Sequence, residues 1–466
     1  MSIVNILARS VSELSYDDIS DEALYWAKLG VLDTIGVTLA GVPEPCTQKI
    51  ARIVAAEGGG ILDDGPSLMF GFGRRTSASN AALVNGVGAH ALDFDDCNNT
   101  LGGHPSAPIL PGLFALVDAR GATGRDVILA YLAGFEVETA LGRVLNTHHY
   151  AKGWHPTATL GVFGAGAAAA KLMGLGEEGV ATALSLCASF ASGVKANFGT
   201  MTKPLHVGHT ARNGVMAALL AEQGFTANDG VFEHPQGFLN VYNGAGNFDE
   251  SRLLDGWANP FNIVRPGLAI KQHPCCGSTH SSIDTMLALR VEHGLTQDNV
   301  AKILTQTHPH RLAHTNRANP KSGLDAKFSV QYVVSRALMH GQIRIEHFEN
   351  DAHDDPTARA IMDRVTSEPH PRAGELDPPV FSEVTVTLTN GKVVSKMLSE
   401  PIGRSPDSPY PLGAVRTKFM DCAQRVLPME IVEQLASQIE SLEDVEDVRA
   451  VISLMDTPTA IAERVA

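Results

Sequence analysis

Apolar residues recur at steps of three and four through the first half of the chain, which is the spacing of one face of an α-helix. Glycine closes or follows several of these stretches, as is common at the carboxyl ends of helices. Many helical positions are Ala or Gly, which let neighbouring helices pack closely. This half is therefore predicted to be all α-helical. The clearest stretches are residues 21–41, 107–121, 126–145 and 209–225.

The pattern changes in the second half of the chain. The segments "VAKILTQTHP" (residues 300–309) and "SEVTVTLTNGKVVSKML" (residues 382–398) are rich in β-branched residues and predict strands. In the second segment, Asn390 followed by Gly391 is a strong signal for the turn of a β-hairpin.

Helical patterns over residues 278–294 and 326–341 accompany these strands, so this part is predicted to be an α+β domain. The pattern is helical again from residue 413. No internal repeat or long low-complexity linker interrupts the chain. The sequence therefore predicts a mainly α-helical protein, with a large helical domain and a smaller α+β domain.

Composition narrows the class of protein. The length of 466 residues suggests two or three domains. The 36 basic and 51 acidic side chains give a net charge of -15 without a basic stripe, so nucleic acid is not an expected partner. The six cysteines show neither zinc-ligand spacing nor a disulfide framework, which fits a reducing compartment. Because the N-terminus lacks a signal-peptide pattern and no apolar run reaches membrane-spanning length, we expect a soluble cytoplasmic protein without a membrane partner.

A histidine beside three aspartates opens the first candidate site, "HALDFDDCNNTLGGHPSAP". Asp93, Asp95 and Asp96 follow His90, and His104 stands directly before a proline and a predicted helix. Free amides at a helix start favour anions such as carboxylates, which makes His104 a candidate. Two alternatives are a solvated acidic loop and a magnesium site that resembles the proton-donating motif of terpene cyclases. The aromatic content of only 6% speaks against a terpene pocket.

The same arrangement recurs at His155, again directly before a proline. Proline disfavours the helical conformation for the residue that precedes it, so His155 is predicted to project from a loop end. Further along, Lys203 in "GTMTKPLHVGH" could bind a carboxylate or, if buried, act as an acid or base; its plainer interpretation is a solvated lysine. His206 and His209 are spaced for a metal, but no third ligand is evident, so no metal is expected.

A third cluster, "AIKQHPCCGSTHSSID", begins the α+β domain with Lys271, His273, Cys275 and Cys276. A domain junction is a common place for a ligand cleft. A cysteine nucleophile is one interpretation of this cluster, and a tight turn that leads into a helix is the simpler one. Glycine-rich segments elsewhere follow no strand, and no phosphate-binding loop occurs, so no dinucleotide cofactor is expected.

Taken together, the segments "HALDFDD", "HPSAPILPG", "GWHPTATLGVFGAGAAAAKLMGL", "MTKPLHVGHTARNG" and "KQHPCCGSTHSSID" resemble the MmgE/PrpD family, in the same order and over nearly the whole chain. That family includes 2-methylcitrate dehydratase, cis-aconitate decarboxylase and iminodisuccinate epimerase. The resemblance implies a helical domain built from residues 1–267 and 401–466, an α+β domain of residues 268–400 inserted between them, and a homodimer.

The resemblance also implies proton chemistry on small di- or tricarboxylic acids, without a metal or organic cofactor, at an active site between the two domains. The matching positions are Asp93, His104, His155, Lys203 and Lys271. Lysines and helix starts can hold carboxylates, while histidines that titrate near neutral pH can move protons. His155 is then expected to be an acid or base beside an anion-binding helix end.

Two positions depart from the decarboxylases of that family. Cys97 follows "DFDD" where they resemble "DFDDT", and His314 in "AHTNRANP" stands where they carry a tyrosine. Tyr150, five residues before His155, could supply a phenol instead. The predicted site has a catalytic set, His155, Lys203, His104 and Tyr150, and a substrate-binding set, Asp93, Lys271, His273 and His314.

The several acid–base groups and these departures favour an enzyme that moves a proton at the carbon next to a carboxylate, and specifically an epimerase of the iminodisuccinate type. An epimerase needs acid–base groups on both faces of that carbon. A hydro-lyase of the 2-methylcitrate dehydratase type is the first alternative, and a cis-aconitate-type decarboxylase is the second. The alternative from another class is a carboxylate-binding protein without catalysis, although binding alone does not call for so many titratable groups.

Overall fold

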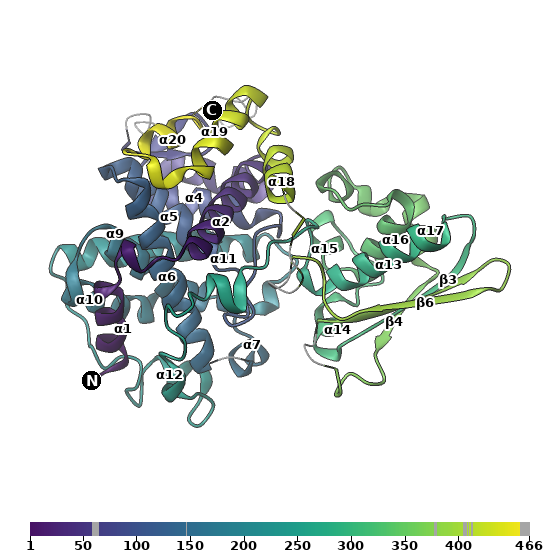
Figure 1. The fold of residues 1–466 in the computed structure, drawn as a ribbon, viewed down its shortest axis with the longest axis horizontal. Helices are drawn as coiled ribbons and strands as arrows, with labels where there is room; N and C mark the ends of the chain where they lie inside the picture. Colours follow the sequence, from purple (N-terminus) through teal and green to yellow (C-terminus); the bar gives the residue numbers. More distant parts are fainter. Residues whose placement is uncertain are drawn as a thin grey trace. The chain divides into compact units, whose positions relative to one another are not determined.

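The chain forms two compact units. The computed structural model describes residues 1–57, 65–145, 147–376, 380–403, 408, 410–411 and 413–456 (Figure 1). The helical unit comprises Met1–Ala91, Asp95–Ile270 and Pro411–Ala466, and the mixed unit comprises Leu92–Phe94 and Lys271–Tyr410. The prediction of a mainly α-helical protein with a smaller α+β part is confirmed.

The short segment Leu92–Phe94 groups with the mixed unit, whereas the sequence placed it inside the helical domain. Two lysines of the mixed unit explain this grouping. Lys271 Nζ donates to the backbone oxygen of Asp93 at 2.7 Å, and Lys327 Nζ donates to that of Leu92 at 2.6 Å. Hydrogen bonds of this kind between distant segments leave no trace in the hydrophobic pattern.

Helices are the main elements of the helical unit, whose described residues also form one small antiparallel pair of strands, β1 (Ser67–Met69) and β2 (Arg74–Thr76). Its described α-helices are α1 (Ile3–Glu13), α2 (Asp21–Ala40), α3 (Pro45–Glu57), α4 (Ala78–Ala91), α5 (Ser106–Arg120), α6 (Gly124–Leu145), α7 (His148–Lys152), α8 (Pro156–Thr159), α9 (Gly161–Leu172), α10 (Gly176–Phe190), α11 (Thr202–Glu222), α12 (Phe238–Asn243), α18 (Ala414–Ala423), α19 (Met429–Glu440) and α20 (Arg449–Ser453).

Helices α4 and α11 approach each other closely because small residues face each other. A Cβ added to Gly86 would lie 2.8 Å from Cα of Gly208, and a Cβ on Gly208 would lie 2.3 Å from the backbone oxygen of Leu83. Any larger side chain there would push the two helices apart. This packing brings the end of α4, which carries His90, next to the start of α11, which carries Lys203.

Helix α2 lies in the core of the helical unit. Among the described residues, it is the helix whose length and composition would allow it to cross a membrane, with a mean hydropathy of 1.2. However, 72% of that stretch is buried inside the protein. Helix α18, from the other end of the chain, covers it (Figure 1): Lys418 Nζ lies 2.7 Å from Asp33 Oδ1, and a Cβ on Gly36 would lie 3.0 Å from the ring of Phe419. Its apolar composition therefore serves packing within this unit.

The mixed unit is built on a sheet with the strand order β4-β3-β5-β6, in which β3 and β4 are parallel and the other pairs are antiparallel. Helices α13 and α16 pack on each other and on the sheet. The described elements of this unit are α13 (His280–His293), β3 (Val300–Thr307), α14 (Pro309–Thr315), α15 (Gly323–Ala326), α16 (Val330–His340), α17 (Pro356–Met362), β4 (Val365–Pro369), β5 (Ser382–Leu388) and β6 (Val393–Leu398).

The sequence predicted β3 and the hairpin of β5 and β6, and all three strands are confirmed. Gly391 in the turn has a φ of +85°, a conformation that glycine adopts without strain. Strand β4 was not predicted. It lies at the edge of the sheet, only Val365 of its residues is buried, and it ends at Pro369, so it lacks the pattern of a half-buried strand.

Candidate active site

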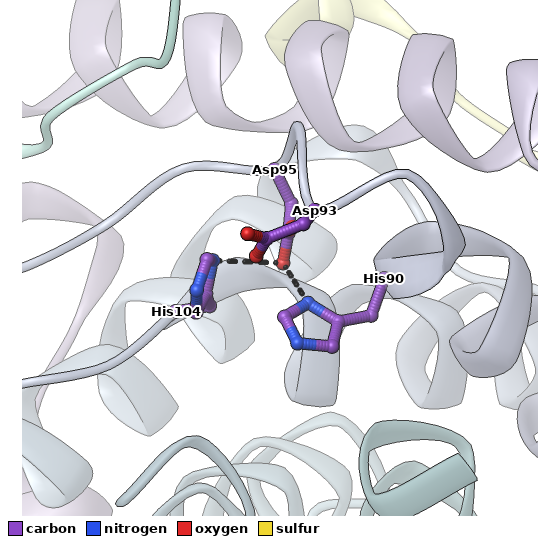
Figure 2. A group of neighbouring side chains, drawn as sticks. All are labelled: His90, Asp93, Asp95 and His104. Atoms are coloured by element: carbon purple, nitrogen blue, oxygen red, sulfur yellow. Dashed lines mark hydrogen bonds and ion pairs between the residues drawn. The ribbon is translucent and has the colours of Figure 1, made fainter. Parts of the chain in front are cut away.

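Two histidine rings of the helical unit point at one buried carboxylate (Figure 2). Asp95 Oδ2 lies 2.7 Å from Nδ1 of His90 and 3.1 Å from Nδ1 of His104. The side chains of Asp95 and His90 are fully buried. Local structure brings them together, because His90 occupies the last turn of α4 and His104 stands just before α5. The backbone N–H of His104 is in turn held by Thr157 Oγ1 at 3.0 Å.

This geometry fixes the charges of the cluster. Burial opposes the negative charge of Asp95, but His104 and His90 together hold its pKa well below the usual value. Burial lowers the pKa of His90 to about 3, although Asp95 acts in the opposite direction. Asp95 is therefore ionised and accepts hydrogen bonds, so each ring donates from Nδ1. The Nε2 atom of the neutral His90 ring is left as an acceptor.

Lys203 uses that acceptor. Its Nζ lies 2.8 Å from Nε2 of His90, and its side chain is only 4% exposed. The interpretation of Lys203 as a solvated surface lysine is therefore wrong. The ring of Phe198 lies 5.2 Å from the same Nζ, which adds a cation–π contact. A continuous chain from Asp95 through His90 to Lys203 thus positions one amino group inside the helical unit.

His155 lies beside this chain. It is the residue before α8, with a non-helical φ of -96° and ψ of 96°, which confirms that its proline keeps it out of the helix. Its ring centre lies 5.7 Å from that of His90 and 4.9 Å from that of Phe198, and its Nδ1 lies 3.3 Å from Nδ1 of His206. Burial, followed by the charge of Lys203, lowers the pKa of His155 well below its usual value. The neutral form of His155 is therefore favoured near pH 7.

Three of the predicted catalytic residues, His104, His155 and Lys203, thus gather around His90. Such a site offers one buried amino group and two imidazoles, the groups needed to bind a carboxylate and to move a proton. Their roles in a reaction remain predictions.

Tyr150, the fourth residue of the predicted catalytic set, lies on α7. Lys195 Nζ lies 3.2 Å from the centre of its ring and donates to its backbone oxygen at 2.9 Å. The structure therefore gives Tyr150 a cation–π partner, and its expected part as a phenol donor remains a prediction.

The predicted substrate-binding residues belong to the mixed unit and have partners there. Asp93, whose φ is +52°, forms an ion pair with Lys271, in which Nζ lies 3.1 Å from Oδ1. His273 Nε2 lies 2.8 Å from a carboxylate oxygen of Asp284.

His314 Nε2 lies 3.0 Å from the hydroxyl oxygen of Ser278, which also accepts from Arg311 at 3.2 Å. This arrangement places a polar imidazole, in contact with a hydroxyl, where the decarboxylases of the family are expected to carry a phenol. Contact with substrate remains a prediction for all four residues of the substrate-binding set.

His90, Asp95 and Asp96 stand next to predicted site residues in the sequence but are not part of the predicted site. The interpretation of the three aspartates as a solvated loop is wrong, since Asp93, Asp95 and Asp96 are 2% exposed or less. The sequence did contain a signal for His90. This residue lies in the last turn of an apolar helix, and a buried histidine needs a hydrogen-bond partner. Nothing in the sequence, however, says which of three neighbouring aspartates is that partner.

A second buried network lies behind the first. Asp96 accepts hydrogen bonds from the backbone N–H and the hydroxyl of Ser106, and that hydroxyl lies 2.5 Å from the phenol oxygen of Tyr131. Burial and the nearby Asp33 raise the pKa of Asp96 well above its usual value, and burial does the same for Glu138. Burial therefore favours the protonated, neutral form of both carboxyl groups.

The donor set does not fit the magnesium interpretation. Ligand atoms of His90, Asp93, Asp95 and His104 do lie within 4.8 Å of one another. Magnesium, however, prefers several carboxylate and carbonyl oxygens, whereas two of these four groups are imidazoles whose Nδ1 atoms already bind Asp95, and Asp93 is paired with Lys271. The cluster fits a hydrogen-bonded acid–base site better.

The cysteine interpretation is also weakened. All six cysteines are free. Burial raises the pKa of the Cys275 thiol to about 12, so it carries almost no thiolate near neutral pH. Cys97 is buried in the helical unit, with Sγ 3.9 Å from Nδ1 of His104, and so lies at the candidate site.

The fold and the cluster together define a mainly α-helical protein with a buried group of histidines, an aspartate and a lysine. The chain matches the MmgE/PrpD N-terminal domain over residues 5–251 and the MmgE/PrpD C-terminal domain over residues 273–444. It therefore belongs to the MmgE/PrpD family, as the sequence motifs predicted.

The relatives that the chain matches are cis-aconitate decarboxylases and a 2-methylcitrate dehydratase. The chain is 28% identical to the cis-aconitate decarboxylase of Mus musculus, over 98% of this chain and 94% of the relative. It is 29% identical to that of Homo sapiens, over 98% and 95%. It is 22% identical to the mitochondrial 2-methylcitrate dehydratase of Yarrowia lipolytica, over 86% and 80%. These relatives are lyases and support the two lyase alternatives better than the epimerase.

Proposed function

We propose that the protein is a lyase that acts on a small tricarboxylic acid and releases CO2 from an acid of the cis-aconitate type. The observation that carries this proposal is the similarity to decarboxylases along 98% of the chain. The buried cluster of His104, His155 and Lys203 supplies the chemistry. The sequence alone favoured an epimerase. We no longer prefer that function, because none of the matched relatives is named as an epimerase.

Decarboxylation sets two demands that the helical unit can meet. When CO2 leaves, the electron pair of the broken bond stays on the carbon skeleton, where it must be stabilised and then protonated. Lys203 is the buried positive charge that can hold a carboxylate and stabilise the developing negative charge. His155 is the acid that can protonate the carbon.

A hydro-lyase of the 2-methylcitrate dehydratase type is the second candidate. The observation that favours it is the 22% identity to the mitochondrial 2-methylcitrate dehydratase of Yarrowia lipolytica over 86% of this chain. Dehydration needs a base that removes the proton next to a carboxylate and an acid that protonates the leaving hydroxyl. His155 and His104 could divide these two roles.

An NMR assay in heavy water tests the proposal. The full-length protein is incubated with cis-aconitate, 2-methylcitrate, citrate and iminodisuccinate in turn. We expect cis-aconitate to lose CO2 and the product to carry one deuterium on the newly protonated carbon. Loss of water from 2-methylcitrate without loss of CO2 would establish the second candidate. Deuterium uptake with inversion of iminodisuccinate would restore the epimerase, and stoichiometric binding without exchange would indicate a binding protein.

The same assay tests the expectation that no metal or organic cofactor is needed. Because the cluster is held by its own hydrogen bonds, we expect the rate to be unchanged after dialysis against a strong chelator. A rate that is lost on dialysis and restored by magnesium or zinc would contradict this prediction and would give the group of His90, Asp95 and His104 a metal.

We also propose that the protein is a homodimer, is located in the cytoplasm, and has no nucleic-acid or membrane partner. The family resemblance supports the dimer, and the net charge of -15 supports the lack of a nucleic-acid partner. Light scattering on the purified full-length protein measures the oligomeric state directly.

A further inference from the structure

His206 is a polar residue in contact with the proposed acid, and the reaction described above gives it no part. It lies on α11, one turn after Lys203, and is half-buried. Its Nδ1 lies 3.3 Å from Nδ1 of His155, and the ring centres are 5.5 Å apart.

The backbone of Gly193 lies close to both residues of this pair. The backbone N–H of His155 donates to the carbonyl oxygen of Gly193 at 3.1 Å. A Cβ on Gly193, whose φ is +121°, would lie 3.3 Å from Cγ and Nδ1 of His206. The two imidazoles therefore meet through one defined pair of atoms.

A hydrogen bond between two imidazole Nδ1 atoms needs one protonated and one unprotonated nitrogen. Both rings must then be neutral or share one charge. Burial and the charge of Lys203 lower the pKa of His206 to about 4, and the same two causes lower that of His155. Both rings are therefore neutral near pH 7, so the tautomer of one ring decides the tautomer of the other.

We propose that His206 is a positioning residue that donates its Nδ1–H to Nδ1 of His155 and thereby keeps the proton of His155 on Nε2. The inference rests on the proposed function, in which His155 protonates the substrate carbon. An acid needs its proton on the nitrogen that faces the substrate, and with Nδ1 of His155 occupied by His206, that nitrogen is Nε2. As this proton passes to the carbon, the Nδ1 proton of His206 passes to Nδ1 of His155, and water returns a proton to Nε2 of the half-buried His206, so neither ring is left as an anion. A histidine held in the wrong tautomer cannot take this part, even when its ring is correctly placed.

Nitrogen-15 NMR of the full-length protein, labelled at histidine, tests the inference. The signals of His155 are identified by their absence from the spectrum of His155→Gln. Near neutral pH we expect wild-type His155 to be neutral with its proton on Nε2. In His206→Leu, which lacks the donor, we expect a mixture of both tautomers and a kcat lowered by about tenfold or more, with KM changed by less than about twofold.

Two further variants separate positioning from packing. His206→Asn keeps an N–H that can reach Nδ1, so we expect it to restore the Nε2 tautomer and much of the kcat. His209→Leu changes an exposed histidine three residues further along α11 and should alter neither measurement.

The outcomes divide clearly. The inference is wrong if wild-type His155 carries its proton on Nδ1, or if the tautomer is unchanged in His206→Leu, even with a lower kcat. If the tautomer shifts as expected while the wild-type protein decarboxylates none of the acids, the proposed function fails and the positioning by His206 stands.

Discussion

His155→Gln is expected to bind a tricarboxylate nearly as well as the wild-type protein while losing about 100- to 10,000-fold of turnover. Glutamine keeps the polarity and approximate size of histidine but cannot exchange a proton near neutral pH. His155 is 2% exposed and lies beside His90, Phe198 and His206, so water cannot easily take over the proton transfer. Initial rates, deuterium incorporation and equilibrium binding of an unreactive tricarboxylate together measure the effect.

The matched control is His148→Gln, an exposed histidine seven residues earlier, which should leave all three measurements unchanged. If His155→Gln keeps the wild-type rate of deuterium incorporation, His155 is a structural turn residue before α8. If binding alone collapses, His155 holds the substrate and another group transfers the proton.

Lys203→Met is expected to fold normally and to lose about tenfold to a few hundredfold in kcat/KM. A hydrogen bond to a charged group contributes about 1.5–3 kcal/mol, which corresponds to this range. Lys203 is only 4% exposed, and methionine keeps most of its aliphatic stem. Circular dichroism and the Tm should therefore change little.

The pH profile of this variant adds a second readout. Lys203 lowers the pKa of His155 and of His206, so removal of its positive charge favours both imidazolium forms. A limb of the profile that reports either histidine should therefore move to higher pH. Lys152→Met, an exposed lysine on α7, should reproduce the wild-type profile. A near-wild-type kcat/KM in folded Lys203→Met would remove Lys203 from the site.

Local patterns predicted most of the fold. The helical periodicity between residues 21 and 225 reflects helices that bury one face or are buried all round, and these helices are present. Strands β3, β5 and β6 carry enough β-branched residues to be recognised. Strand β4 could not be recognised, because a largely exposed edge strand does not need an apolar face.

The candidate site could be predicted only in part. His104 and His155 were found because a proline dictates the backbone before it, and this effect is local in sequence. Asp93 and Asp95 are indistinguishable by residue type. The direction of the loop decides that Asp95 meets two imidazoles while Asp93, at a φ of +52°, pairs with Lys271, 178 residues further along.

The packing of α18 on α2 has a consequence for folding during synthesis of the chain. Helix α18 begins at Ala414, 374 residues after α2 ends at Ala40. At a synthesis rate of about 5–20 residues per second, the ribosome needs roughly 20–75 s to deliver it. During that time the nascent chain exposes an apolar helix surface and the carboxylate of Asp33 without Lys418 and Phe419. The unfinished protein is thus a natural client for a chaperone, and a chain released before α18 is complete should aggregate or be degraded.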